Sequence, residues 1–243
     1  MSRRDEMRLA LRDAFPIMIA YFPLSVTYGV LAAAGSLSPL LTIFSSVWIY
    51  SGGAQFMLLG MFAAASAPVM IVTTILLVSM RHVLYGATMG PYVANWKESL
   101  KWAVAYGLTD EGFAVTSSKA AREGGLTPTY YLTFAFAGYG SWVAGTVAGT
   151  GLGGLVTSEL ATILGFALPA LFLALLLGGD RTLPSMAAAG SGAILATLAG
   201  MLNLGGAGLI IGGLIGATIG QQLKYRIQKY STVRSAETSS KAS

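Results

Sequence analysis

The sequence has no cysteine, one histidine and few charged residues. Without cysteine there are no disulfide bonds or thiolate metal sites, and one histidine excludes a site built from several. Charged residues make up 10% of the chain, against about 25% in soluble domains. The sequence also lacks a dinucleotide fingerprint after a strand, a phosphate-binding P-loop and an HExxH motif. These absences argue against a soluble enzyme and against a metal or other cofactor.

Apolar residues are what the sequence has in excess. Hydrophobic residues make up 54% of the 243 positions. A chain of this length holds roughly seven or eight membrane helices of about 20 residues each and leaves no room for a sizeable soluble domain. The 31 glycines suit membrane helices, in which small residues let backbones approach closely. The sequence therefore predicts an all-α integral membrane protein, a polytopic helical bundle of about eight spans.

Eight apolar runs define the expected spans. They cover residues 14–34, 39–64, 67–92, 100–118, 128–151, 159–178, 184–202 and 204–222. Residues 1–13 are expected to form a basic cytoplasmic N-terminus ahead of the transporter domain, 14–222. Residues 223–243 are basic and rich in serine, and we expect a disordered tail. No clear cleavage site follows the first apolar run, so we expect no cleaved signal peptide.

The net charge of +5 arises mainly from basic residues near the two ends of the chain. With eight spans and a cytoplasmic N-terminus, 12 of the 15 basic residues lie in the cytoplasm, Lys97 and Lys101 lie outside, and Arg81 lies in the membrane. The positive-inside rule therefore favours eight spans, or seven plus a re-entrant pair. The same distribution argues against a nucleic-acid partner.

An internal repeat is one interpretation of the first six spans. At an offset of 89 residues, Ser38-Pro39 aligns with Thr127-Pro128, Tyr50 with Tyr139 and Gly60 with Gly149; at an offset of 85, Tyr21 aligns with Tyr106. Two adjacent three-span units would be inverted relative to one another, as in many secondary transporters. The identities are few in a glycine-rich sequence, so a chance match is the alternative.

Two of the apolar runs are interrupted in their interior by ionisable residues. Arg81 and His82 interrupt the third expected span, and Asp110 and Glu111 interrupt the fourth. Ionisable groups inside spans are costly, usually face a protein interior or a wet cavity, and often mark a transport path. We therefore expect the function to reside at these positions.

The two acids are adjacent, so on a helix they point about 100° apart and at most one faces a central cavity directly. A carboxyl group in a partly dry site can take up and release a proton, as proton-coupled transport requires. We therefore interpret Asp110 and Glu111 as proton-coupling residues. The alternative is a shorter segment near the membrane surface, with both acids solvated.

Arg81 and Tyr85 are four residues apart and share one helical face. The planar guanidinium group suits a carboxylate, either of a substrate or of Asp110 in a structural ion pair. His82 is interpreted as a proton shuttle, with a hydrogen-bonded packing role as the alternative. His82 with Ser79 could form the nucleophile and base of an intramembrane enzyme, but no third orienting group is evident.

Paired glycines in the second expected span, Gly52 and Gly53, can break a helix inside the membrane. Backbone N–H groups at the start of the second half-helix would then bind an anionic group, and Gln55 would add a side-chain donor. The alternative is close packing at the glycines, with Gln55 bonded to a neighbouring helix.

Glycines recur every four residues in the last expected span, at Gly208, Gly212, Gly216 and Gly220. This spacing forms one groove that accepts a second helix closely, either from the same chain or from a partner. No polar side chain lines that face, so the groove is interpreted as a packing surface.

Taken together, these motifs resemble the AzlC-type branched-chain amino acid exporters. The elements of the resemblance are Phe15-Pro16 and Pro23–Gly29 in the first span, Tyr50–Phe56 in the second, Arg81–Gly86 in the third and Thr109–Glu111 in the fourth. Ser79 departs from the pattern, which has an asparagine there. This puts any hydrogen-bonding role of that position in doubt.

The resemblance implies export of leucine, isoleucine, valine and their analogues across a bacterial cytoplasmic membrane. It also implies a small second membrane subunit of the AzlD type, which would occupy the glycine groove. We expect the substrate carboxylate to meet Arg81 or the break at Gly52–Gln55, and its ammonium group to meet Asp110 or Glu111. The aliphatic side chain would pack on Phe56, Tyr85 or Phe113.

Proton antiport is the expected energy source, because an acid in the fourth span could exchange an ammonium group for a proton. Two alternatives to this function stay open. One is a non-transporting scaffold or chaperone subunit of a membrane complex. The other is an exporter of other small amphipathic solutes.

Overall fold

The computed structural model describes residues 2–153, 157–164, 166, 170, 173, 182–202 and 206–240. Within these ranges the regular structure is helical, which confirms the all-α prediction. Among the described residues, three stretches are long and apolar enough to cross a membrane: Arg3–Ala34, Pro68–Val93 and Leu183–Met201. The chain divides into two compact units, Met1–Pro169 and Ala170–Ser243.

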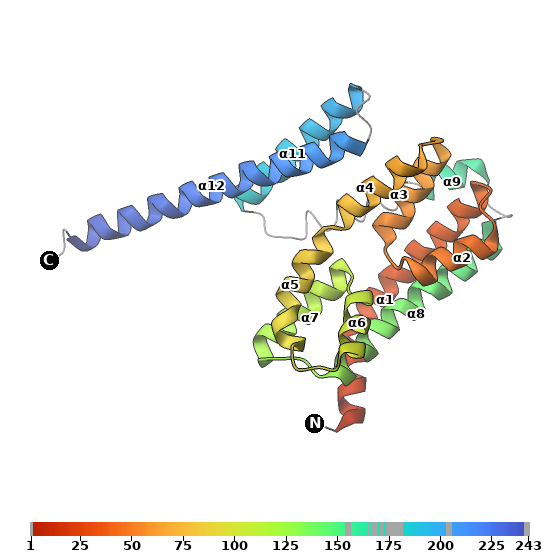
Figure 1. The fold of residues 1–243 in the computed structure, drawn as a ribbon, viewed down its shortest axis with the longest axis horizontal. Coiled ribbons are helices and arrows are strands. Elements are labelled where there is room, and N and C mark those ends of the chain that lie inside the picture. The colour runs from red at the N-terminus through yellow and green to blue at the C-terminus, as the bar shows by residue number, and fades with distance from the viewer. Residues whose placement is uncertain are drawn as a thin grey trace. The chain divides into compact units, whose positions relative to one another are not determined.

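Two long helices, α1 (Arg3–Ala34) and α8 (Pro128–Leu152), run side by side and in parallel through the first unit (Figure 1). Each starts at a side-chain cap, Ser2 and Thr127 respectively. Near these starts, Thr127 Oγ1 donates to Glu6 Oε2 over 3.1 Å. Further along, Ser141 Oγ donates to the Met18 carbonyl oxygen over 2.8 Å. α1 begins well before residue 14, because its capped first turn extends the helix through the basic N-terminus.

The expected second span is two half-helices, α2 (Pro39–Trp48) and α3 (Gly52–Ala63). The chain reverses direction between them, since Gln55 Nε2 donates to Ser46 Oγ over 2.8 Å. Residues nine apart in one straight helix would lie about 13 Å apart along its axis. The structure therefore corrects the prediction of one crossing helix over residues 39–64, while the break falls where the paired glycines predicted it.

The expected third span consists of α4 (Pro68–Ser79) and α5 (Arg81–Val93), which run end to end with only Met80 between them. α5 leads into α6 (Glu98–Tyr106) and α7 (Asp110–Glu123), which cover the expected fourth span.

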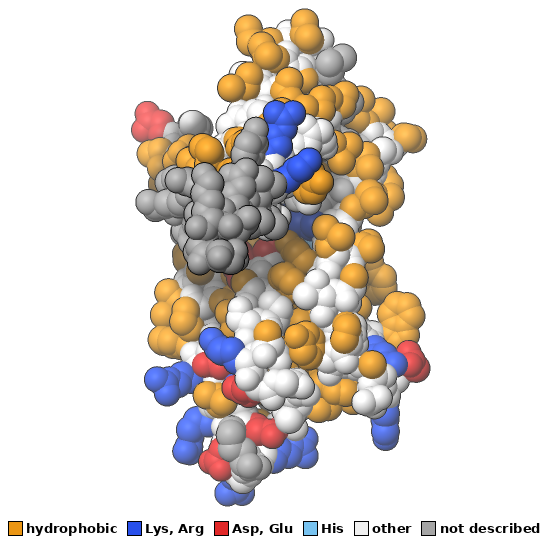
Figure 2. All heavy atoms as spheres, turned by 90° about the vertical axis from the view of Figure 1, so that its left-hand side faces the viewer, with side chains coloured by type: hydrophobic (Ala, Val, Ile, Leu, Met, Phe, Trp, Pro, Cys, Tyr) orange, Lys and Arg blue, Asp and Glu red, His pale blue; other side chains and the backbone are white. Residues whose placement is uncertain are grey.

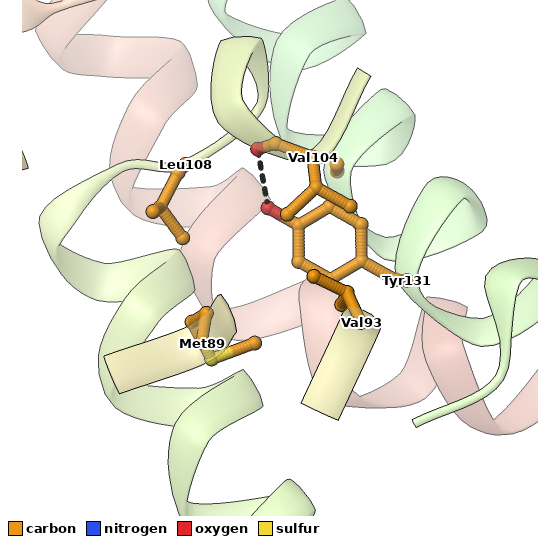
Figure 3. Close-up of a cluster of buried hydrophobic side chains, with 6 residues drawn as sticks. Met89, Val93, Val104, Leu108 and Tyr131 are labelled. Carbon is orange, nitrogen blue, oxygen red and sulfur yellow. Dashed lines mark hydrogen bonds between the residues drawn. The ribbon is translucent and has the colours of Figure 1, made fainter. Parts of the chain in front are cut away.

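α6 and α7 also form a hairpin, as their contacts with α8 show. The Val104 carbonyl oxygen accepts a bond from Tyr131 of α8 (Figure 3). Lys119 of α7 lies over the ring of the neighbouring Tyr130, so the chain has returned to the same level of α8. Buried Met89, Val93 and Leu108 pack around Tyr131. The single crossing helix predicted over residues 100–118 is therefore corrected to a hairpin. Its turn forms because Thr109 caps α7 and starts a new helix.

These two hairpins change the predicted sidedness of the loops. Trp96 packs edge-on against Tyr131 near the start of α8, so the loop before α6 lies at the same end as the N-terminus. Lys97 and Lys101 thus lie at that end and not opposite it. Charged side chains gather at the lower end in Figure 2, the end where Figure 1 shows the N-terminus.

The helix order does not follow the predicted three-span repeat. Its offset of 89 residues aligns the hairpin α2–α3 with the continuous helix α8. Instead, a long helix followed by a hairpin occurs twice, as α1 with α2–α3 and as α4–α5 with α6–α7. The two arrangements run in opposite directions, so their hairpins enter the unit from opposite ends (Figure 1).

α9 (Ser158–Leu164) is the described part of the expected sixth span. Most of the remaining stretch to residue 178 lies outside the described residues. The sequence also predicted a helix break at Asn203–Gly206, of which residues 203–205 lie outside the described residues.

The second unit pairs α11 (Leu183–Met201) with α12 (Gly206–Ser240). A Cβ at Gly212 would lie 2.9 Å from the Gly192 carbonyl oxygen, and one at Gly216 would lie 2.6 Å from that of Ala188. Gly220 likewise faces Ala188, and Gly208 lies on the same face by its spacing. The chain's own α11 therefore occupies this groove, which corrects the expectation of an open groove for a partner.

α12 also extends beyond the expected boundary at residue 222. The helix continues to Ser240, through the stretch for which the sequence predicted a disordered tail. Residues 223–240 contain no glycine or proline, so nothing in their composition ends the helix.

Candidate functional site

The turns of the two hairpins meet against α1 and α8. The Tyr106 hydroxyl, at the end of α6, donates to the Val47 carbonyl oxygen near the end of α2, and Tyr139 of α8 donates to the same oxygen over 3.1 Å. The Tyr50 and Tyr139 ring centroids lie 5.0 Å apart, edge to face. Four tyrosines thus converge here, and they are the ones that pair at the offsets of the internal repeat: Tyr21, Tyr50, Tyr106 and Tyr139. That alignment is the only signal in the sequence for this cluster.

The α2–α3 turn leads into a helix start that has no side-chain cap. Tyr50 has a φ of 43°, a left-handed conformation uncommon for a tyrosine, which turns the chain sharply before α3. Ser51 precedes α3 without a side-chain cap bond, so the first N–H groups of α3, at Gly52 and Gly53, have no side-chain cap. Such a helix start attracts an anion. Gly52 is required for packing, because a Cβ would lie 2.7 Å from the Trp142 ring.

Gln55 is fully buried and bonded on both sides of its amide. Its Nε2 donates to Ser46 Oγ, and its Oε1 accepts from Trp142 Nε1 over 2.9 Å. Phe56 is buried against Tyr28, with ring centroids 5.6 Å apart. These contacts match the alternative that the sequence left open, in which Gln55 bonds neighbouring helices.

Asp110 is held at the start of α7 by two residues of α5. Arg81 Nη2 lies 2.8 Å from Asp110 Oδ2, and the Tyr85 hydroxyl donates to Oδ1 over 2.6 Å. Arg81 Nε is buried and has no hydrogen-bond partner among the described residues. The interhelical ion pair is thus present, and it engages both oxygens of Asp110. We call Arg81, Tyr85 and Asp110 the α5–α7 clamp.

Glu111 faces a different helix, α1. The Tyr21 hydroxyl donates to Glu111 Oε2 over 2.6 Å and lies 2.8 Å from Thr109 Oγ1. The described contacts give no partner to Oε1. The adjacent acids thus face different helices, as their angular separation predicted. Both stand at the positive end of the α7 dipole, which stabilises carboxylates.

Tyr85 and Phe113 stack on each other, with ring centroids 4.3 Å apart, and His82 packs edge-on against Tyr85 at 5.5 Å. His82 Nδ1 lies 2.9 Å from the Ser79 carbonyl oxygen, and no contact with the Ser79 hydroxyl is found in the described contacts of the histidine. The structure thus brings Arg81, His82, Tyr85, Asp110 and Phe113 together. No group of three or more acidic or histidine side chains in the described ranges could hold a metal ion.

A small pocket, which we call the tip pocket, lies beside the two hairpin turns. It is lined by Tyr50, Ala103, Tyr106, Gly107, Leu132, Ala135, Phe136 and Tyr139. Sequence reasoning missed it as a binding surface, because small and aromatic residues of this kind occur throughout a membrane protein. Only the approach of α6, α8 and the α2–α3 turn makes them neighbours.

The comparisons with known proteins agree on one family. A sequence model of the family described as AzlC protein matches residues 16–156. The inner membrane protein YgaZ of Escherichia coli (strain K12) is 35% identical over 78% of this chain and 79% of that protein. The branched-chain amino acid transport protein AzlC of Bacillus subtilis (strain 168) is 28% identical over 71% of this chain and 69% of that protein. No solved structure matches the chain.

Proposed function

Because this chain belongs to the AzlC family of membrane proteins, we propose that it exports branched-chain amino acids from the cytoplasm by proton antiport. The substrate class is supported by the name of the Bacillus subtilis relative. The proposal includes a small membrane subunit of the AzlD type, which rests on the resemblance alone. It also places the N-terminus in the cytoplasm.

The observation that carries the proposal is the pair of half-helices that start near the middle of the first unit. α3 starts with glycine N–H groups that lack a side-chain cap, and α7 starts with two carboxylates. An amino acid carries an anionic and a cationic group, and these two helix starts are complementary to them. Broken helices whose ends face a substrate are a recurrent device of secondary transporters.

We assign the exchange of ammonium for a proton to Glu111. Asp110 already has both oxygens engaged by the α5–α7 clamp, whereas Glu111 has a single donor, Tyr21, on one oxygen and Thr109 nearby. In this scheme Glu111 is ionised when it binds the substrate ammonium and takes up a proton when the substrate leaves. One proton then enters for each amino acid that is released outside.

The substrate carboxylate is assigned to the start of α3 at Gly52 and Gly53. Arg81, the alternative from the sequence, is committed to Asp110 in the structure. Gln55 is not part of the proposed site, because its amide is saturated by Ser46 and Trp142.

The charge of the two ends supports the proposed orientation. All described basic residues of the first unit except Arg81 lie in α1 before residue 13 or between Lys97 and Arg122. The hairpins place both groups at the end of the N-terminus, while the loops 35–38 and 64–67 at the other end contain no lysine or arginine. This asymmetry supports a cytoplasmic N-terminus.

The test is efflux of radiolabelled leucine from preloaded cells that co-express the chain and a candidate small partner. We expect export by the wild type and at least a tenfold loss in Glu111→Gln at equal membrane level. A glutamine amide cannot take up the proton, and positioned side chains that transfer protons contribute about 100-fold or more to a rate. Glu98→Gln is the matched control, because Glu98 is exposed and pairs only with Lys101. Wild-type export by Glu111→Gln would contradict the antiport assignment. Absence of export by the wild type would favour the scaffold alternative.

A further inference from the structure

We propose that the tip pocket receives the aliphatic side chain of the substrate and sets the specificity of the transporter; this inference rests on the function proposed above. In this assignment the tip pocket is the apolar part of the substrate site, instead of Phe56, Tyr85 or Phe113 as the sequence predicted. Those rings already contact one another or Tyr28. The tip pocket, in contrast, is open space between described side chains.

The size of the tip pocket suits a short branched side chain. Its volume is about 50 Å³. One water-sized group needs roughly 10–15 Å³ on this measure, so the pocket holds about four such groups. The isopropyl group of valine and the isobutyl group of leucine match that room. The methyl group of alanine leaves most of it empty, and the benzyl group of phenylalanine exceeds it.

The pocket presents a mainly apolar surface, although three of the residues that line it are tyrosines. The hydroxyls of Tyr106 and Tyr139 both donate to the Val47 carbonyl oxygen, so these residues present their rings. The Tyr50 hydroxyl points toward Gly138, where a Cβ would lie 3.1 Å from it. The aromatic faces of Tyr106 and Tyr139, whose hydroxyls are already bonded, favour an apolar ligand group over water.

The pocket is also in the right place for a substrate with a charged head. Tyr50 forms one wall and lies two residues before Gly52, where α3 starts. Gly107 forms another wall and lies directly before the turn that leads to Asp110 and Glu111. The turns that carry the proposed carboxylate and ammonium sites therefore also shape the pocket. Tyr106 and Phe136, both largely exposed, form part of its lining and leave it open.

Two opposite changes test the assignment. Ala103→Leu adds bulk to the pocket from α6, and Leu132→Ala enlarges it from α8. Ala105→Leu is the matched control: it makes the same change on the same half-helix, at an exposed position outside the pocket. The assay is self-exchange of one amino acid at a time, radiolabelled against unlabelled leucine, valine, alanine or phenylalanine, in vesicles from cells that co-express the full chain and the candidate partner.

We expect Ala103→Leu to lower leucine exchange about tenfold while alanine exchange is kept, because a small change of volume in an apolar pocket discriminates by roughly 10–200-fold. Leu132→Ala should admit phenylalanine, which the wild type excludes. Unchanged selectivity in both variants, with leucine exchanged by the wild type, would overturn the pocket assignment and leave the proposed function intact. If the wild type exchanges none of the four amino acids, the proposed function fails and this inference fails with it. If Ala103→Leu does not fold, Leu132→Ala alone decides.

Discussion

At the scale of single residues, buried polar groups determine how the first unit packs. Gln55 links α3 to α2 and α8 through Ser46 and Trp142, and Ser46 continues the network to Thr146 over 2.7 Å. Because each of these buried groups has a partner, the network stabilises one arrangement of the three helices. A residue that looks like a substrate ligand in the sequence is thus a structural residue in the fold.

The α5–α7 clamp is a second structural element at this scale. Arg81→Ala would leave Asp110 with Tyr85 as its remaining partner. The two charged side chains are 29% and 24% exposed, so solvent screens the pair in part and we expect a loss of about 1–2 kcal/mol in the free energy of unfolding. The double variant Arg81→Ala/Asp110→Asn should lose less than the sum of the single losses, since no unpaired charge is left.

Unfolding midpoints of the wild type, the two single variants and the double variant in detergent measure this coupling. Strictly additive losses would show that the Arg81–Asp110 contact has no stabilising role.

At the scale of elements, glycines decide how closely α1 and α8 approach. A Cβ at Gly149 would overlap the Val26 carbonyl oxygen, and one at Gly29 would lie 2.5 Å from that of Thr146. Backbones this close bring many atoms into contact, which is how membrane helices associate without a hydrophobic driving force.

We therefore predict that Gly149→Ala lowers the free energy of unfolding by about 1–3 kcal/mol, the usual cost of overpacking. Gly151→Ala is the control, because it lies on the same helix and nothing approaches its Cβ position within 4 Å. That variant should be neutral or slightly stabilised, since alanine favours a helix over glycine. Thermal unfolding of the two variants in the same detergent makes the comparison. Equal midpoints would mean that the α1–α8 contact is looser than the structure shows.

Chain reversal in the hairpins is a second feature at the scale of elements. In α6–α7 the Thr109 cap, the Gly107 turn and the bond from Tyr131 to Val104 together reverse the chain. A Cβ at Gly107 would lie 2.9 Å from Ala135 Cβ, so only glycine lets this turn reach α8. The apolar run alone predicts one crossing helix, because hydropathy does not show whether the chain reverses direction within the run.

At the scale of the whole molecule, the hairpins determine which loops share a side of the membrane. The structure puts the loop at Asn95 at the end of the N-terminus and the loop at Ala64 at the opposite end. Eight crossing spans would place both loops the other way round. The natural chain has no cysteine, so single cysteines can be introduced without a background.

We predict that Asn95→Cys reacts with a membrane-impermeant maleimide only from the cytoplasmic side, and Ala64→Cys only from outside. Both positions are exposed. Ser2→Cys is the control that marks the side of the N-terminus, which we propose to be cytoplasmic. Labelling of Asn95→Cys and Ser2→Cys from opposite sides would contradict the shared end of the two segments and restore a crossing helix over residues 100–118.

The sequence by itself determined the class of the protein and the residues worth examining. Low charge and long apolar runs indicate helices in a membrane, because a helix pairs its backbone groups within one segment and needs no water to satisfy them. The positions of Arg81, Asp110 and Glu111 inside such runs identified costly groups, and the glycine pair at Gly52 located one helix break. The family resemblance was also recoverable, since its motifs are short and local.

Only the tertiary structure decided which residues meet. The division between Asp110, held by Arg81, and Glu111, bonded to Tyr21, depends on which helices flank α7. The tip pocket exists because Tyr50 and Ala135, far apart in the sequence, are brought together by two turns. Chain reversal and contacts between distant segments arise from packing and capping, which hydrophobic periodicity does not encode.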